Sequence, residues 1–422
     1  MPIYPRSVRG RFRTIKHGIL AFAYGVYFLL PWLRWERASA PDQGVLLDLP
    51  GRRFYLFDLV VHPQDIYWLA AALVIAAMLL FFVTGIAGRV FCGYFCFQTL
   101  WTDLFMLIER RVQGERPARI RLDQAPWTPE KLRKKGLTHL LWLLAALATG
   151  VTFTLYWGDA PRLARQLFTG EAPFPAYATA LFLAATTYLM AGHVREQACT
   201  YMCPYARFQS AMFDRDTLIV AYDARRGEGA AGRRSLARGL KTREERHAAG
   251  VGDCVDCGYC VQVCPTGIDI RDGLQLECIT CALCIDACDS IMGSLGWPRG
   301  LVGYTSERAQ AGGRTRVLKP KTAGYAVALA AMIGFLAWSI ASRAAFDMAV
   351  YQVRQPLYVR LSDGGVRNSY EIKLNNKTER PLTFGFALRG LPGATLDTGR
   401  LERVTLAPGE GLTVLAHVRR PP

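Results

Sequence analysis

The chain has 422 residues, of which 51% are hydrophobic, and it carries a formal net charge of +17. Such a charge would suit a nucleic-acid-binding protein, but the basic residues lie mainly in segments that flank long apolar runs. The segment 251–300 is itself acidic, with two basic residues against seven acidic ones. This distribution fits membrane topology and anionic lipid, and it argues against nucleic acid as a partner.

Apolar runs of membrane length recur along the chain. They cover about residues 17–35, 66–88, 137–157, 174–193 and 323–340. A helix rises about 1.5 Å per residue, so roughly 20 apolar residues cross a hydrocarbon core of ~30 Å. We therefore predict five transmembrane α-helices, with the two chain ends on opposite sides of the membrane.

The Lys and Arg counts predict the orientation. Segments 1–16, 89–136 and 194–320 contain five, ten and seventeen basic residues, whereas loops 34–65 and 158–172 contain four and two. Cytoplasmic segments carry the excess of Lys and Arg, so the N-terminus and the cysteine-rich segment are predicted in the cytoplasm and the tail after Arg343 is predicted to be periplasmic or otherwise external. We expect a multi-pass membrane protein. All twelve cysteines precede Ser290, which fits a reducing compartment.

Two cysteine pairs follow predicted membrane spans: Cys92 and Cys96 after the second, Cys199 and Cys203 after the fourth. An i,i+4 spacing places two side chains on one helix face, so the pairs could form a four-thiolate site at the membrane surface. Soft ligands favour Cu(I), zinc or an iron–sulfur cluster, with Met202, Met190 and His193 as supplements. Packing cysteines or a reversible dithiol remain the alternatives.

The segment 221–250 is rich in Arg, Gly and Ala, and we interpret it as a mobile basic linker. It contains the G-x-G-x-x-G spacing at Gly227, Gly229 and Gly232. No complete βαβ unit surrounds these glycines, so a dinucleotide site is not predicted.

Eight cysteines between residues 254 and 288 form two C-x2-C-x2-C-x3-C runs. In two-cluster bacterial ferredoxins, three cysteines of one such run hold one [4Fe–4S] cluster and the fourth crosses to the other. We predict two clusters, one held by Cys254, Cys257, Cys260 and Cys288, the other by Cys278, Cys281, Cys284 and Cys264. Zinc sites usually separate their C-x2-C pairs, and disulfides need an oxidising compartment, so both alternatives are weaker.

The tail alternates apolar and polar residues in short pieces such as SYEIKL, LTFGFAL and LTVLAHV, separated by turn sequences. This pattern predicts a small all-β sandwich. The predicted parts are a four-helix transmembrane region (1–220), a basic linker (221–250), a two-cluster ferredoxin α+β domain (251–300), a linker with the fifth transmembrane helix (301–342) and an immunoglobulin-like β-sandwich (343–422).

Four stretches, in order, resemble one known family: RVFCGYFCFQTLWTD, REQACTYMCPYARFQSAMFDRDTLIVAYD, PTGIDIRDGLQLECITCALCIDACD and GWPRGLVGYTSE. They are similar to the CcoG (FixG/RdxA) family of cytochrome c oxidase accessory proteins, over nearly the whole chain. Two departures are that Phe97 stands where the family usually has Pro, as Pro204 does in the second pair, and that the C-terminal domain ends early, at Pro422.

The resemblance implies a cupric reductase that supplies Cu(I) for assembly of a cbb-type cytochrome c oxidase. It implies copper, or a third iron–sulfur cluster, at Cys92, Cys96, Cys199 and Cys203, and it implies a copper chaperone or oxidase subunits as partners beside an unidentified cytoplasmic electron donor. The residues alone indicate a membrane-bound electron carrier with a thiolate metal site. A quinol-linked electron relay and a non-enzymatic assembly scaffold are the rival hypotheses.

Overall fold

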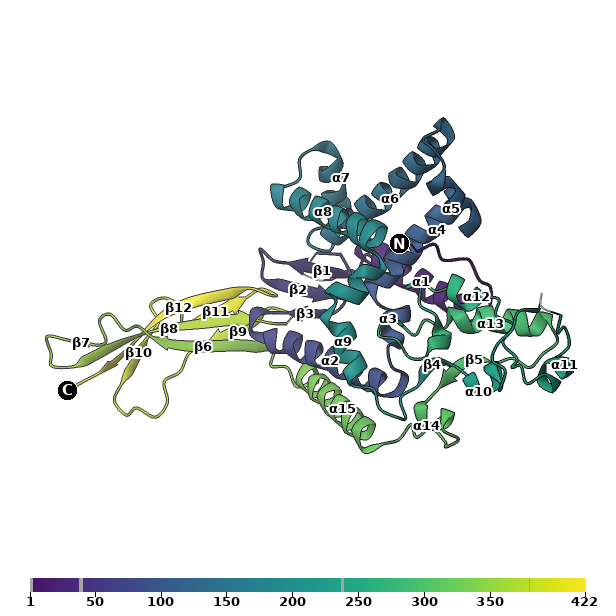
Figure 1. The fold of residues 1–422 in the computed structure, drawn as a ribbon. Helices are drawn as coiled ribbons and strands as arrows, with labels where there is room; N and C mark the ends of the chain where they lie inside the picture. Colours follow the sequence, from purple (N-terminus) through teal and green to yellow (C-terminus); the bar gives the residue numbers. More distant parts are fainter. Residues whose placement is uncertain (1–2, 38–40, 237–238, 379) are drawn as a thin grey trace. The chain divides into compact units, whose positions relative to one another are not determined.

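The computed structural model describes residues 3–37, 41–236, 239–378 and 380–422, which fold into two compact units (Figure 1). The first unit comprises Met1–Leu33 and Leu69–Ile333, and the second comprises Arg34–Trp68 and Gly334–Pro422. The five-part division predicted from the sequence stays a prediction. By its contacts, the loop at residues 34–65 belongs with the C-terminal segment and not with the helices that flank it in the chain.

Among the described residues, five helices are long and apolar enough to cross a membrane: Pro63–Ala87, Val90–Gln113, Pro129–Leu155, Phe174–Val194 and Pro320–Ala341. This confirms the predicted number, and four of the five coincide with predicted runs. The exception is the predicted run 17–35. Its helix, α1 (Arg11–Leu29), begins with three basic residues that lower its hydropathy, so it is not among the five.

The unpredicted candidate Val90–Gln113 is not one continuous helix. It consists of α3 (Val90–Tyr94) and α4 (Phe97–Gln113), and α4 buries Asp103 against Arg13 of α1 at 2.9 Å. Its first end touches the cysteine-rich segment, and Glu115, just after its last residue, accepts a hydrogen bond from the Ser7 backbone N–H at 3.4 Å. The residue before Ser7, Arg6, donates its backbone N–H to the carbonyl of Gln262 in the cysteine-rich segment. Both ends of this candidate therefore lie toward the cysteine-rich part of the unit.

The remaining helices of the bundle pack through small residues. The helix α6 (Pro129–Leu155) lies against α8 (Phe174–Thr187), which continues as the π-helix η3 (Tyr188–Val194). A Cβ atom on Gly150 would lie 2.1 Å from the Ala180 carbonyl oxygen, so glycine permits the close approach of the two helices. The core of this group contains Phe105, Trp142, Ala146, Ala184 and Ala191.

The cysteine-rich segment is closed by a strand pair. The strand β4 (Ile219–Tyr222) pairs antiparallel with β5 (Val302–Thr305), with Ile219 opposite Thr305. Between them lie α10 (Ala224–Glu228), α11 (Arg243–Ala248), α12 (Tyr259–Gln262), the 3-10 helix η6 (Ile270–Asp272) and α13 (Leu283–Ser294). The described residues of the predicted linker, 221–236 and 239–250, lie within the region that these two strands close, and the linker itself stays a prediction.

Charge pairing explains why the predicted linker folds back. Arg226 and Arg243 donate to the buried carboxylate of Asp253 at 2.7 and 2.9 Å, and His247 lies 2.9 Å from it. Burial alone would raise the pKa of Asp253, but these hydrogen bonds lower it well below its usual range. The glycines at 227 and 229 serve close packing, since a Cβ on Gly227 would lie 2.1 Å from the Tyr222 hydroxyl.

Other short elements complete the first unit. They are the 3-10 helix η1 (Leu30–Trp32), α5 (Arg116–Gln124), α7 (Ala160–Thr169), the π-helix η4 (Ala198–Met202), α9 (Pro204–Ala211) and α14 (Glu307–Gln310). The helices α2 (Ile66–Ala87) and α15 (Pro320–Ala341) each run from one unit into the other.

The second unit contains the predicted β-sandwich. One sheet has the order β10–β12–β8–β6, with β7 paired to β8, and the other pairs β11 with β9. The strands are β6 (Phe346–Gln352), β7 (Val359–Arg360), β8 (Val366–Asn376), β9 (Leu382–Gly385), β10 (Thr395–Asp397), β11 (Arg403–Leu406) and β12 (Gly411–Arg420). Ile372, Leu374, Leu406, Val414 and Ala416 pack between the sheets. The prediction of an immunoglobulin-like all-β domain is confirmed.

The same unit includes a small sheet that the sequence did not reveal. Its strands β1 (Val45–Asp48), β2 (Arg53–Leu56) and β3 (Leu59–Val61) are followed by the 3-10 helix η2 (Pro63–Asp65). The Asp65 carboxylate, with 3% of its side chain exposed, pairs with Lys377 at 2.8 Å and with Arg343 at 3.3 Å. This ion pairing joins two segments that are distant in the chain.

We expect Asp65→Ala to destabilise the second unit by about 1–3 kcal/mol, because Arg343 and the buried Lys377 ammonium lose the carboxylate they share and Lys377 keeps only Asp347. Hydrogen–deuterium exchange of the full-length protein should show faster exchange in β1–β3. The matched control is Asp42→Ala, which removes an exposed carboxylate of the same loop. Equal protection in the two variants would contradict the role given to Asp65.

Candidate functional site

The eight cysteines of the ferredoxin segment surround two adjacent cavities in the first unit. One has an empty volume of about 370 Å³. Four cysteines line it: Cys254, Cys257, Cys260 and Cys288. These are the four residues predicted to hold one cluster, and Cys288 comes from the second cysteine run. We call this group the first cysteine site.

The second cavity has an empty volume of about 360 Å³. The cysteines that line it are Cys260, Cys264, Cys278, Cys281 and Cys284. All four members of the second predicted set are present, and Cys260 belongs to the wall that the two cavities share. We call the set of Cys264, Cys278, Cys281 and Cys284 the second cysteine site. The fourth cysteine of each run thus lies with the three of the other, as the crossed pattern predicts.

The two runs have the same local backbone. Gly258 and Ala282 are the N-caps of α12 and α13, and both have left-handed φ values, of 63° and 61°. Asp256 and Thr280 also have positive φ, of 50° and 56°. An L-residue rarely adopts this region, so the turn at each run is imposed by its surroundings. Such turns let consecutive thiols point into one cavity.

Burial dominates the chemistry of these thiols. Burial, and to a smaller extent the neighbouring Cys260 and Cys254, raise the pKa of Cys288 to about 12. Burial likewise raises the pKa of Cys281 to about 12. Thiols in such a setting are protonated at neutral pH, and only a bound cation makes the thiolate favourable. An apolar cavity lined by four thiols therefore fits an iron–sulfur cluster, whose iron supplies that charge.

The four membrane cysteines come from two similar helix breaks. Cys92 lies in α3 and Cys96 is the N-cap of α4; Cys199 lies in η4 and Cys203 is the N-cap of α9. The prediction that each pair shares one helix face is therefore wrong, because the chain turns between the two cysteines. Phe97 begins α4 as Pro204 begins α9, so the break is present without proline.

The four thiols lie near one another. Burial, and to a smaller extent the thiols of Cys96 and Cys92, raise the pKa of Cys199 to about 11; Cys203 acts in the same direction. The Cys92 thiol donates a hydrogen bond to Gln209 Oε1 at 2.9 Å. Within the part of the chain that the structure describes, neither these thiols nor those of the ferredoxin segment form a group of three His, Cys, Asp or Glu side chains already placed as metal ligands are.

The predicted supplementary ligands make other contacts. His193 stacks on His139, with ring centroids 5.8 Å apart, and Met202 has 60% of its surface exposed. The backbone carbonyl of Met190 accepts a hydrogen bond from Gln98. The role of these three side chains as additional ligands stays a prediction.

The membrane cysteines touch the second cysteine site. Cys92 belongs to one buried apolar cluster with Ile279 and Cys281. A Cβ atom on Gly93 would lie 2.7 Å from the Ile279 carbonyl oxygen and 2.9 Å from Cys281 Cα, so the backbones are in direct contact. The Tyr94 hydroxyl donates to the Cys281 carbonyl at 3.1 Å. Sequence reasoning missed these contacts, and the glycine and tyrosine between the two cysteines of the first pair were the available signal.

The family profiles that match the chain divide it in the same way. A 4Fe–4S dicluster domain matches residues 194–307, and a 4Fe–4S binding domain matches residues 69–114, which include Cys92 and Cys96. The IG-like fold at the C-terminus of FixG matches residues 336–422. These matches support iron–sulfur clusters in this chain.

Three curated proteins are similar over most of their length. Protein RdxA of Cereibacter sphaeroides is 46% identical, over 93% of this chain and 83% of its own. The nitrogen fixation protein FixG of Rhizobium meliloti is 42% identical, over 96% and 83%. Protein RdxB of Cereibacter sphaeroides is 46% identical, over 89% and 79%. No solved structure matches the chain.

We expect Gly93→Ala to destabilise the first unit by about 1–3 kcal/mol, because its methyl group would overlap the backbone at Ile279 and Cys281. Thermal unfolding in detergent, followed by the visible absorbance of the clusters, measures the loss. Gly136→Ala in α6 is the control, since no atom outside its own helix turn lies within 4 Å of the added carbon. Equal unfolding temperatures for the two variants would show that the contact at Gly93 does not constrain the fold.

Proposed function

Because the chain belongs to the FixG/RdxA family and is a membrane-associated iron–sulfur electron-transfer protein, we propose that it reduces Cu(II) to Cu(I) for assembly of a cbb-type cytochrome c oxidase. In this proposal the two cysteine sites hold two [4Fe–4S] clusters, and Cys92, Cys96, Cys199 and Cys203 bind the copper ion that is the substrate.

The contact of Gly93, next to Cys92, with the Cys281 backbone carries the proposal. It joins the thiols that would bind copper to a residue of the second cysteine site through a buried apolar cluster. When bound, the two clusters supply one electron at a time, which is the number that converts one Cu(II) to one Cu(I).

The four thiols suit copper as a substrate. Sulfur ligands are soft and favour Cu(I) over Cu(II), so binding at these residues makes the reduction more favourable. Cys203 is exposed and Cys92 is buried, so the group has one member open to an arriving ion and another beside the electron source. The ion is reduced where it is bound, and the thiols retain the product.

The proposed orientation follows the Lys and Arg distribution. The cysteine-rich segment is assigned to the cytoplasm and the β-sandwich to the periplasm of an inner membrane. The packing of residues 34–68 in one unit with residues 334–422 agrees with this, since both would lie on the periplasmic side. We assign the sandwich the docking of a copper chaperone or of oxidase subunits.

One observation favours a second candidate. The 4Fe–4S binding profile matches residues 69–114 and includes Cys92 and Cys96, so these thiols could hold a third cluster in a quinol-linked relay. Three clusters contain about twelve iron atoms and two contain about eight. Iron analysis of the protein against the variant Cys92→Ser/Cys96→Ser/Cys199→Ser/Cys203→Ser distinguishes the two. A loss of about four iron atoms in the variant would support the third cluster and overturn copper binding at these residues.

For the cupric reductase we expect that chemically reduced, anaerobically reconstituted protein forms Cu(I) from Cu(II) with one electron lost per ion. A chromogenic Cu(I) chelator measures the Cu(I) formed, and the cluster absorbance measures the electrons lost in the same sample. The four-serine variant should retain its clusters yet form Cu(I) at least tenfold more slowly.

Reduced clusters that do not respond to Cu(II) would overturn the proposal. The scaffold hypothesis makes a separate prediction, namely that Cys254→Ser/Cys257→Ser leaves oxidase assembly normal in cells.

A further inference from the structure

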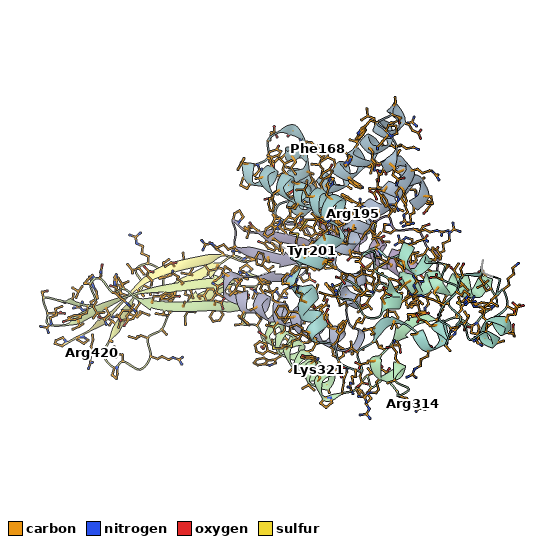
Figure 2. The ribbon with its side chains drawn as sticks, in the orientation of Figure 1. Phe168, Arg195, Tyr201, Arg314, Lys321 and Arg420 are labelled. Carbon is orange, nitrogen blue, oxygen red and sulfur yellow. The ribbon has the colours of Figure 1, made fainter. Side chains whose placement is uncertain are left out.

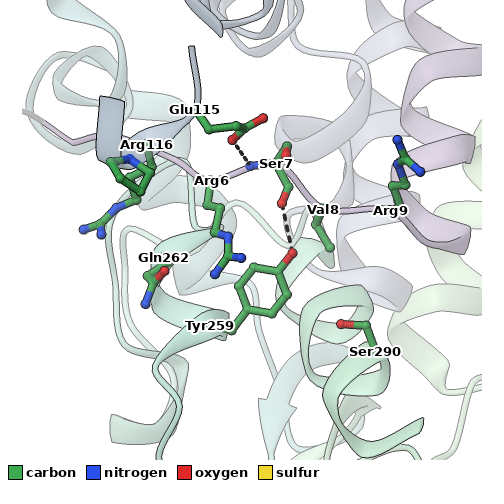
Figure 3. Close-up of a pocket in the computed structure, with 10 residues that line it drawn as sticks. Arg6, Ser7, Val8, Arg9, Glu115, Arg116, Tyr259, Gln262 and Ser290 are labelled. Carbon is green, nitrogen blue, oxygen red and sulfur yellow. Dashed lines mark hydrogen bonds between the residues drawn. The ribbon is translucent and has the colours of Figure 1, made fainter. Parts of the chain in front are cut away.

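A cavity lined by arginines opens beside the first cysteine site (Figure 3). It has about 1050 Å³ of empty space, its open mouth included. The residues that matter here are Arg6, Arg9, Glu115, Arg116, Tyr259 and Ser290. We call this space the arginine cavity.

The inner wall of the arginine cavity belongs to the first cysteine site. Tyr259 precedes Cys260 directly, and Ser290 follows Cys288 by two residues. Both cysteines line the first site, so two of its four thiols are connected to the cavity by one or two peptide units. Val8 and Tyr259 of the cavity also pack in the buried cluster that contains Cys281 of the second site.

The outer wall is built by the N-terminal segment, which is fastened across α12. The backbone N–H of Arg6 donates to the Gln262 carbonyl at 2.7 Å, and the Tyr259 hydroxyl donates to the Ser7 carbonyl at 2.9 Å. The Arg6 guanidinium lies 4.6 Å from the centroid of the Tyr259 ring. Figure 3 shows the two side chains next to each other. Arg116 is held on the other side by its hydrogen bond to the Tyr4 carbonyl at 2.9 Å.

The charge of the cavity differs from that of the segment it borders. The segment 251–300 has two basic residues against seven acidic ones, whereas three arginines and one glutamate line the cavity. All three arginines come from outside the segment. Arg6 and Arg9 are exposed, so their charges stand at the rim, where they would meet a surface. A positive rim on an acidic background steers an anionic partner to one place.

We propose that the arginine cavity is the docking site of an acidic one-electron donor protein. This deepens the proposed function, on whose clusters it rests. A cluster accepts one electron at a time, whereas a nicotinamide cofactor delivers a hydride, so the direct donor is a one-electron carrier. One electron leaves the donor, which is oxidised, and arrives at the first site, which is reduced; no bond forms or breaks.

The test uses the full-length reconstituted protein with an acidic flavodoxin as the probe. Binding of oxidised flavodoxin is measured by titration calorimetry, and reduction by flavodoxin hydroquinone is followed by stopped flow, with rates expressed per cluster from the iron content. The variants are Arg9→Glu and Arg116→Glu. Arg314→Glu is the control, because it makes the same charge change on the exposed segment after α14 (Figure 2).

We expect each cavity variant to bind flavodoxin and to be reduced by it about tenfold less well than the control at low ionic strength. The difference should vanish near 1 M salt, where the Debye length is about 3 Å. Arg9→Glu still tests the docking site if Arg116→Glu misfolds, because within the described residues the Arg9 side chain holds no other segment by a hydrogen bond.

Two outcomes overturn the docking site: cavity variants that behave as the control does, or binding of free flavin mononucleotide that the variants lose while flavodoxin binding persists. The proposed function fails separately. If flavodoxin reduces the clusters in an arginine-dependent way but no Cu(I) forms, the docking site stands and the cupric reductase proposal is overturned.

Discussion

The contact of Gly93 with the backbone at Ile279 and Cys281 is the constraint on which the site depends. It brings a membrane cysteine pair and the second cysteine run together without an intervening side chain. Any larger residue at position 93 would separate them. The hydroxyl of Tyr94 and the packing of Cys92 beside Cys281 then fix the approach from two further directions. An electron path between the two groups of thiols is possible because this one residue has no side chain.

Buried carboxylates hold the parts of the first unit around that contact. Asp286 of α13 accepts from the backbone N–H groups of Phe12 and Arg13, at 3.2 and 2.7 Å, and so caps the start of α1. Asp103 of α4 pairs with the Arg13 side chain, and Asp253 collects two arginines from the predicted linker. Each carboxylate is buried and would be costly alone, so each specifies which basic segment must fold against it.

The chain gathers its cysteine sites and the arginine cavity in one region. The two cysteine-lined cavities share Cys260, and Val8 and Tyr259 of the arginine cavity pack in the buried cluster that contains Cys92 and Cys281. In the proposed function an electron would pass from a donor at the arginine cavity through the cysteine sites to copper. The proposed docking surface and the proposed copper-binding thiols lie on different residues, since a charged protein surface and a soft ion need opposite environments.

Sequence patterns predicted the residues of the two cysteine sites. The spacing of the two ferredoxin runs predicted which cysteines share a cavity, because a short loop leaves a thiol few places to point. Apolar runs and alternation predicted the membrane helices and the β-sandwich. The breaks before α4 and α9 and the contacts between distant segments were not predicted. Such contacts are those of Gly93 with Cys281, of Arg226 with Asp253 and of Asp65 with Lys377. Local patterns report a residue's own environment, whereas such contacts arise from the packing of several elements at once, which no single stretch contains.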